Sequence, residues 1–119
     1  MNKDFLKFQR VFTQYQKLFG LTGYKVYFKH EPIEGSYANL TSAHPCMTAT
    51  ARLNSEVPDT AKANINIHSN SKHEAIHLLL ARLEDRAVNR WATHDEVTEA
   101  VEEIVYKLET LIPDLKENK

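Results

Sequence analysis

The fold and the chemistry of this chain both depend on residues 71–83, which read SKHEAIHLLLARL. The apolar residues of this stretch recur every three or four positions, and this spacing predicts an amphipathic helix. On such a helix His73 and His77 are four residues apart, so their imidazoles project from one face about one turn from each other. Imidazole nitrogens placed in this way can bind one ion of zinc or of a similar cation. The stretch therefore predicts a helix that carries a metal site.

Glu74 follows His73 directly and completes the pattern His-Glu-x-x-His. It leaves the helix about 100° from His73, which places it beside a metal ion and outside the ligand set. Zinc lowers the pKa of a bound water to about 7, and a neighbouring carboxylate can accept the proton of that water. We therefore expect Zn²⁺ on His73 and His77 and a general base at Glu74. In a purely structural alternative, Glu74 completes a capping box that begins at Ser71, and His77 is a surface residue.

The segments before the motif predict a helix followed by a small sheet. Apolar residues at helical spacing run from Phe5 to Phe19, and Gly20 marks the end of the helix. Runs rich in alternating or β-branched residues then predict strands, the last of which ends at residues 69–71, where Ser, Asn and Ser are suited to cap the motif helix. The expected elements are a helix over 3–19, strands over 24–29, 36–40, 46–53 and 63–68, and a loop over 57–60.

The segment after the motif predicts one more helix. Thr93 and Glu96 have the spacing of a capping box, an apolar stripe runs from Val97 to Ile112, and Pro113 ends the pattern. The resulting order is a helix, three or four strands, and two helices. Strands grouped before helices predict an α+β fold in which helices cover one face of a small sheet. A chain of 119 residues fits a single domain over 1–119.

The charge and cysteine content exclude several classes of protein. The chain has 15 basic and 16 acidic side chains, and this balance argues against a nucleic-acid coat. Its one cysteine, Cys46, excludes an internal disulfide and is compatible with a reducing cytosol. The apolar runs are too short to cross a bilayer, and the first residues lack the features of a secretory signal. We therefore expect a cytoplasmic protein with no nucleic-acid or membrane partner.

From about Tyr24 to Ile112 the chain resembles small phage and prophage proteins that are built as minimal zinc metallopeptidases of the gluzincin type. The resemblance rests on a strand over 24–29, on HEAIHLLLARL over 73–83 and on EEIVYKLE over 102–109. It implies a minimal zincin-like fold whose last two helices carry the metal site. It also implies that His73 and His77 are zinc ligands, that Glu74 is the base, and that an acid of the last helix is the third ligand.

Four residues are candidates for the third ligand: His94, Glu99, Glu102 and Glu103. Glu99 with Glu103 resembles the thermolysin-type pattern, in which a second acid four residues after the ligand orients a histidine. Glu102, with apolar residues two and three positions later and a leucine six positions later, resembles the phage-type pattern. Helical geometry also places Glu102 at the border of the apolar stripe. We prefer Glu102, with Glu99 next.

Two functions from different classes follow from these residues. The first is a zinc-dependent metallopeptidase that acts on a peptide or protein substrate, with Glu74 as general base. The second is a non-catalytic, zinc-stabilised module that binds a phage or host protein. Both require zinc, but only the first requires a base, so the two functions differ in what they need from Glu74.

Overall fold

The structure is a computed structural model that describes residues 2–62 and 65–114. The chain forms two compact units, residues 1–81 and 82–119, and each is described by itself. The elements in chain order are α1 (Lys3–Leu18), β1 (Lys25–Glu31), β2 (Ala38–Ala43), the 3₁₀ turn η1 (His44–Cys46), β3 (Thr48–Asn54), α2 (Asp59–Lys62), α3 (Ile67–Val88) and α4 (His94–Leu111). This order confirms the predicted α+β class, with an N-terminal helix, a small sheet and later helices.

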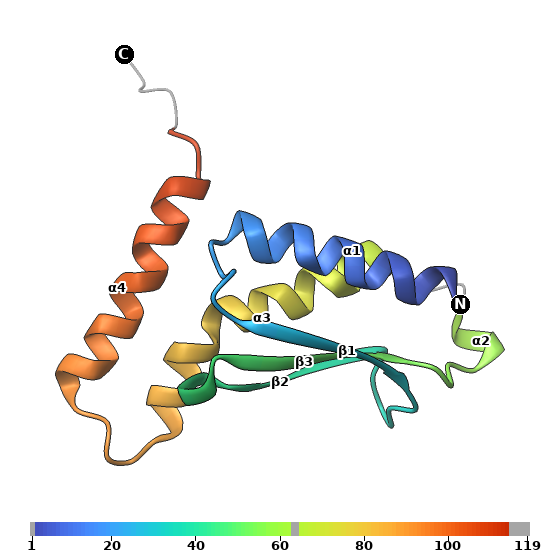
Figure 1. The fold of residues 1–119 in the computed structure, drawn as a ribbon, viewed down its shortest axis with the longest axis horizontal. Helices are drawn as coiled ribbons and strands as arrows, with labels where there is room; N and C mark the ends of the chain where they lie inside the picture. The colour runs from blue at the N-terminus through green and yellow to red at the C-terminus, as the bar shows by residue number, and fades with distance from the viewer. Residues whose placement is uncertain (1, 63–64, 115–119) are drawn as a thin grey trace. The chain divides into compact units, whose positions relative to one another are not determined.

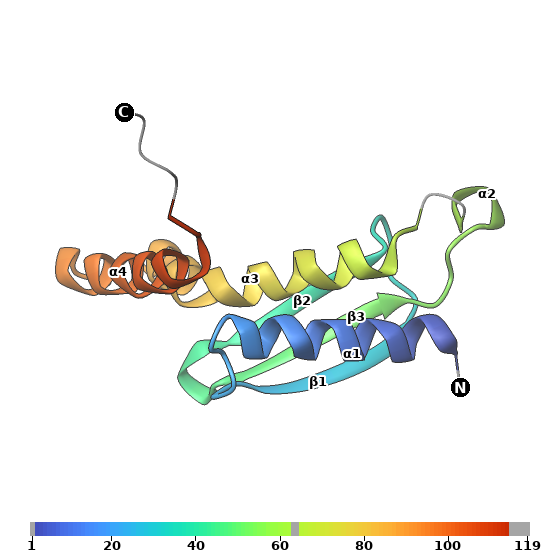
Figure 2. The same ribbon diagram turned by 90° about the horizontal axis from the view of Figure 1, so that it is seen from above.

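The first unit consists of a three-stranded sheet with α1 and the first part of α3 on the same face (Figure 1 and Figure 2). β3 lies in the centre, parallel to β1 and antiparallel to β2. Burial alternates along β3, so that Ala49, Ala51 and Leu53 face the core. The small alanines leave room for the helices to approach the sheet closely. β1 and β3 match the predicted strands to within two residues at each end.

Aromatic side chains form the core between α1 and the sheet. Phe8 and Phe12 are fully buried, and the ring of Phe28 on β1 meets both of them edge-on. The side chain of Gln16 is buried with them, and its amide donates to the carbonyls of Leu21 and Tyr24. These hydrogen bonds connect the end of α1 to the start of β1. The bounds of α1 agree with the predicted helix to within one residue.

The predicted strand over 63–68 is wrong in its second half. Residues 63 and 64 lie outside the described residues, residues 65 and 66 are not in a strand, and residues 67 and 68 already belong to α3. The side-chain oxygen of Asn66 accepts a hydrogen bond from the amide of Ser69 at 2.9 Å, so the helix is capped at Asn66. The motif therefore lies about two turns inside α3 and does not open the helix.

Ser71 is a packing residue and not the predicted helix cap. It is fully buried, and its hydroxyl lies 2.8 Å from the carbonyl oxygen of Ile67 and 3.2 Å from that of Phe8. Its small side chain lets α3 approach α1 closely. Because Ser71 lies inside the helix, the alternative in which it forms a capping box with Glu74 is also wrong.

Smaller differences concern the ends of the strands and one loop. β2 begins at Ala38 and not at residue 36, and β3 begins at Thr48 because the turn η1 precedes it. Met47 ends that turn in the left-handed region, with φ of 53°. The loop expected over 57–60 gives way at Asp59 to the short helix α2.

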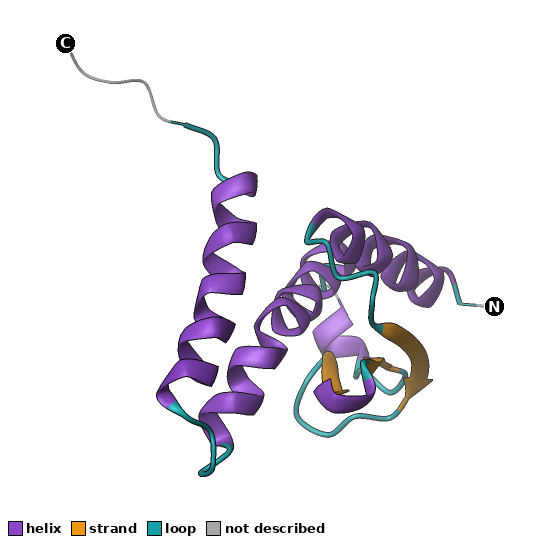
Figure 3. Cartoon of the chain, turned by 60° about the vertical axis from the view of Figure 1, so that its left-hand side comes forward, coloured by secondary structure: helices purple, strands orange, loops and turns teal. Residues whose placement is uncertain are grey.

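In the second unit, the last turns of α3 and the whole of α4 form a helical hairpin (Figure 3). Arg82 forms ion pairs with Glu99 and Glu103. The Nε atom of Arg86 lies 3.5 Å from Oε2 of Glu96. The capping box of Thr93 with Glu96 is present as predicted, so α4 begins where the sequence indicates. Within the described ranges, no helix is both long enough and apolar enough to cross a membrane.

Candidate metal centre

The two histidines of the motif point to one place on the surface of α3. The Nε2 atoms of His73 and His77 are 3.2 Å apart, and their ring centroids are 4.8 Å apart. Zinc binds imidazole nitrogen at about 2.0 to 2.1 Å, so two nitrogen ligands of a tetrahedral ion lie about 3.3 Å from each other. The separation of the two imidazoles therefore fits a shared metal ion. Both side chains are exposed, so an ion can reach them from solvent.

The helix that carries these imidazoles is held by its other face. Ala75, Leu78 and Leu79 are at most 5% exposed and pack into the core of the first unit. Ser71 connects the same helix to α1 through the carbonyl of Phe8. The backbone below the two imidazoles is therefore fixed by packing, and a metal ion would meet a site that is already arranged.

Glu74 is buried beside the two histidines, with 6% of its surface exposed. Burial raises the pKa of its carboxyl above the ordinary value of 4.5, while the imidazoles of His73 and His77 act in the opposite direction. A carboxylate whose pKa is raised accepts a proton more readily near neutral pH. Its carboxylate has no hydrogen bond or ion pair within the described part of the chain, so no other group holds it away from a proton-transfer role.

The acids of α4 differ in what already binds them. Glu99 and Glu103 both accept hydrogen bonds from Arg82. These hydrogen bonds raise the pKa of the Arg82 guanidinium, and the bond to Glu103 has the larger effect. Glu102 is exposed and, among the residues that the structure describes, has no hydrogen-bonding or ionic partner. The side chain of His94 is 93% exposed, and its Nδ1 atom lies 3.8 Å from Oδ1 of Asp95. Glu102 is therefore the candidate glutamate whose carboxylate is not already engaged.

The structure brings together His73 and His77, with Glu74 next to them, but it does not describe Glu102 with them. His73 and His77 belong to the first unit, and Glu102 belongs to the second. In residues 2–62 and 65–114, no group of three or more His, Cys, Asp or Glu side chains is gathered so as to hold a metal ion. The third ligand therefore remains a prediction.

Arg82 has a structural role that was not predicted from the sequence. This residue directly follows the apolar run of the motif helix and forms ion pairs with two acids that are four residues apart on α4. The ion pairs join two helices, so no local pattern in the sequence predicts them.

Comparison with known proteins adds no family to these observations. No protein-family model, no curated protein and no solved structure matches the chain. A function has to be inferred from the paired imidazoles and from Glu74.

Proposed function

We propose that the chain is a zinc-dependent metallopeptidase-like hydrolase, of the gluzincin type that the sequence resembles. The observation that carries the proposal is the separation of 3.2 Å between the Nε2 atoms of His73 and His77. This distance matches two ligands of one tetrahedral zinc ion, on a helix whose opposite face is packed. A hydrogen bond between the two rings produces a similar distance, so a metal measurement has to separate the two explanations.

In this proposal His73 and His77 hold the ion, and Glu74 moves the proton. Bound zinc supplies a Lewis acid, which polarises a peptide carbonyl and lowers the pKa of water. Glu74 accepts a proton from the attacking water and returns it to the nitrogen of the leaving amine. Burial of Glu74 keeps its carboxylate poorly solvated, which increases its basicity.

We propose Glu102 as the third ligand, in preference to Glu99. Recruiting Glu99 would break its ion pair with Arg82, whereas Glu102 has no such partner in the described part of the chain. The carboxylate of Glu102 can therefore bind a metal without the loss of an existing ion pair.

The substrate class that goes with this chemistry is a peptide or protein, and the location that we propose is the cytoplasm, where Cys46 stays reduced. The second candidate function is a zinc-stabilised module that binds another protein without turnover. This alternative needs the two histidines as ligands and no base, so it does not depend on whether Glu74 reaches a substrate.

The experiment that tests the proposal measures zinc by titration and by elemental analysis, together with cleavage of a peptide library. We expect His73→Ala and His77→Ala each to weaken zinc binding by more than about 100-fold, since even partners of ligands change affinity by 10–100-fold. His68→Ala is the matched control, because it removes an exposed histidine from the same helix. Equal affinity of all three variants would reject the metal site.

Glu74→Gln separates the two functions. We expect this variant to keep its zinc and to lose peptide cleavage, because the amide cannot accept the proton of the water. A wild-type protein that binds zinc stoichiometrically and cleaves no peptide of the library would favour the binding module. For the third ligand, Glu102→Ala should weaken zinc binding more than Glu99→Ala does, and the reverse order would reject the assignment.

A further inference from the structure

The outer edge of β1 is open. β1 pairs only with β3 in the order β1-β3-β2, so no other strand of residues 2–62 and 65–114 pairs with its outer edge. In Figure 2 this edge lies on the side of the sheet away from α3, the helix that carries the candidate metal centre. Amide and carbonyl groups along such an edge can hydrogen-bond to another extended chain. The edge is therefore a place where a peptide can add a strand.

Two lysines without an acidic partner lie along this strand. Lys25, Tyr27 and Lys29 are alternate residues of β1, so their side chains project from the sheet face away from the helices, and all three are exposed. Among the described residues neither lysine forms an ion pair, and Nζ of Lys25 lies 5.3 Å from the centre of the Tyr27 ring. The strand has one acid, Glu31, and its carboxylate is paired with Arg52 at 2.9 Å. This face of β1 is therefore positively charged.

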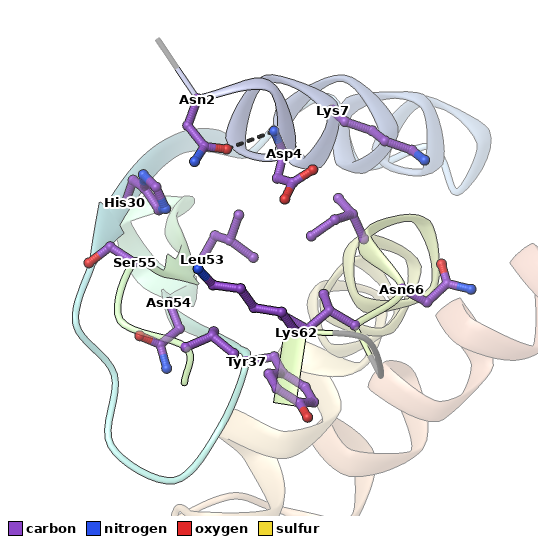
Figure 4. Close-up of a pocket in the computed structure, with 13 residues that line it drawn as sticks. Asn2, Asp4, Lys7, His30, Tyr37, Leu53, Asn54, Ser55, Lys62 and Asn66 are labelled. Atoms are coloured by element: carbon purple, nitrogen blue, oxygen red, sulfur yellow. Dashed lines mark hydrogen bonds between the residues drawn. The ribbon is translucent and has the colours of Figure 1, made fainter. Parts of the chain in front are cut away.

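On the helix side of the strand, a groove of about 440 Å³ lies between α1 and β1. Leu6, Arg10 and Lys17 line it from α1, and Phe28 lines it from β1. Two of the described residues that line it are basic and none is acidic. Asp4 is the one acid of α1, and its side chain points into a different cavity (Figure 4). The groove is therefore partly apolar and has the same sign of charge as the open face.

We propose that β1 binds an acidic, extended segment of a partner protein as an added strand. Alternate side chains of such a segment point to opposite faces of the sheet. Acidic side chains on one face pair with Lys25 and Lys29, and apolar side chains on the other face pack in the groove against Leu6 and Phe28. This inference goes beyond the proposed peptidase function, since no residue of the candidate metal centre belongs to β1 or lines the groove.

A second copy of the chain and a nucleic acid fit this edge less well than an acidic peptide. A second copy would bring the same lysines to the edge, and like charges on paired strands are destabilising. Single-stranded nucleic acids stack successive bases on aromatic rings, but Tyr27 is the one exposed aromatic side chain of β1. The open backbone edge together with the unpaired lysines favours a peptide with acidic side chains.

The test uses a seven-residue peptide that alternates glutamate with valine, and a matched peptide in which glutamine replaces every glutamate. Binding to the whole chain is followed in metal-free buffer by calorimetry and by amide NMR shifts. We expect the acidic peptide to bind more tightly, with shifts centred on β1 and on α1. Two further versions carry N-methyl groups, one on the glutamates and one on the valines, so that each lacks the hydrogen-bond donors of one edge. At least one of them should lose binding.

Three results with these probes would overturn the proposal. The first is equal binding of the acidic and the glutamine peptide, or no binding of either. The second is full binding of both N-methylated versions, since an added strand needs one edge of the peptide. The third is tighter binding of oligothymidylate than of the acidic peptide, which would favour a nucleic-acid surface.

Substitution of surface lysines makes the test specific. Lys25→Gln combined with Lys29→Gln should weaken binding of the acidic peptide by about 4- to 25-fold, because each exposed ion pair contributes a factor of about 2 to 5. Lys7→Gln combined with Lys72→Gln is the matched control, since it removes two exposed lysines of the same unit that lie outside β1 and the groove. The proposal fails if the two double variants bind the peptide equally well.

Discussion

The attachment of the motif helix to its core can be tested with one substitution made at two places. Leu78 and Leu80 lie on either side of Leu79 on α3, directly after the motif. Leu78 is 1% exposed, whereas Leu80 is 37% exposed. Replacing either with alanine changes the helix propensity by the same amount. The difference between the two variants therefore isolates the burial of one side chain.

The expected costs follow from these exposures. Leucine to alanine removes about three carbon groups, worth roughly 2.4 kcal/mol when fully buried, and the cavity that remains brings the cost for Leu78→Ala to about 3–4 kcal/mol. Leu80→Ala loses about 60% of the transfer contribution and leaves no closed cavity, so its cost is about 1.5 kcal/mol. The difference is about 2 kcal/mol. Domains of this size are stable by about 5–15 kcal/mol, so both variants should fold.

The assay is urea unfolding of both variants and of the wild type, followed by far-ultraviolet circular dichroism, without added metal. Leu78→Ala should lower the unfolding midpoint clearly more than Leu80→Ala, with an unchanged slope for both. If the two free energies of unfolding differ by less than about 0.5 kcal/mol, then α3 is not packed as described. The support inferred for the imidazoles would then be wrong as well.

Two further predictions concern buried charge and the helical hairpin. Burial raises the pKa of Glu74 above 4.5 in the folded chain, so its contribution to stability is present at low pH and is lost as the pH rises through the folded pKa. Glu74→Gln should therefore gain stability relative to the wild type as the pH rises above 4.5 in metal-free buffer, measured by urea unfolding. A constant difference would contradict the burial of the charge. Arg82→Met should destabilise α4 by about 1–2 kcal/mol, a value reduced for the 67% exposure of the Glu99 side chain, and hydrogen exchange of the α4 amides measures it. Arg10→Met, at an exposed position of α1, is the control, and equal exchange in both variants would reject the role of Arg82.

The parts of the fold that the sequence predicted are those with a periodic pattern and a local end signal. α1 has apolar residues at helical spacing and ends next to Gly20, which has a φ of 70°. α4 begins at the capping box of Thr93 and Glu96. In both cases the residues that define the element interact within it, so no knowledge of the tertiary structure is needed.

The strand predicted over 63–68 is wrong at residues 65–68, because two patterns overlap there. The alternation of asparagine and isoleucine has the period of a strand, but Ile67 also continues the buried side of α3 through Ser71, Ala75 and Leu78. Asn66 is a good helix cap, and the structure uses it in place of the serines that follow. As a residue type, serine is typical of helix caps, so the sequence alone favours a cap at Ser71. Its burial against α1 is a tertiary contact, which the local sequence does not show.

The candidate site also has one part that the sequence predicts and one part that depends on tertiary structure. The convergence of His73 and His77 follows from the helical period alone, and the structure has it at 3.2 Å between the nitrogens. The pairing of Arg82 with Glu99 and Glu103 depends on how two helices meet, and local sequence does not encode it. This is why the two histidines were predicted from spacing and why the choice among the acids of α4 was not.

A zinc site on this chain would take its first two ligands from a single helix. The distance between the two imidazoles is set by one turn of a packed helix, so two ligands are in place before any other element contributes. In the proposed site a third ligand would add affinity and fix the coordination geometry, but the two histidines alone would already hold the ion. Loss of either histidine should therefore remove zinc binding, whereas loss of Glu102 should weaken it and leave a two-histidine site. Such graded dependence is expected of a metal centre assembled on one helix, and it contrasts with a site whose ligands all come from different elements and fail together.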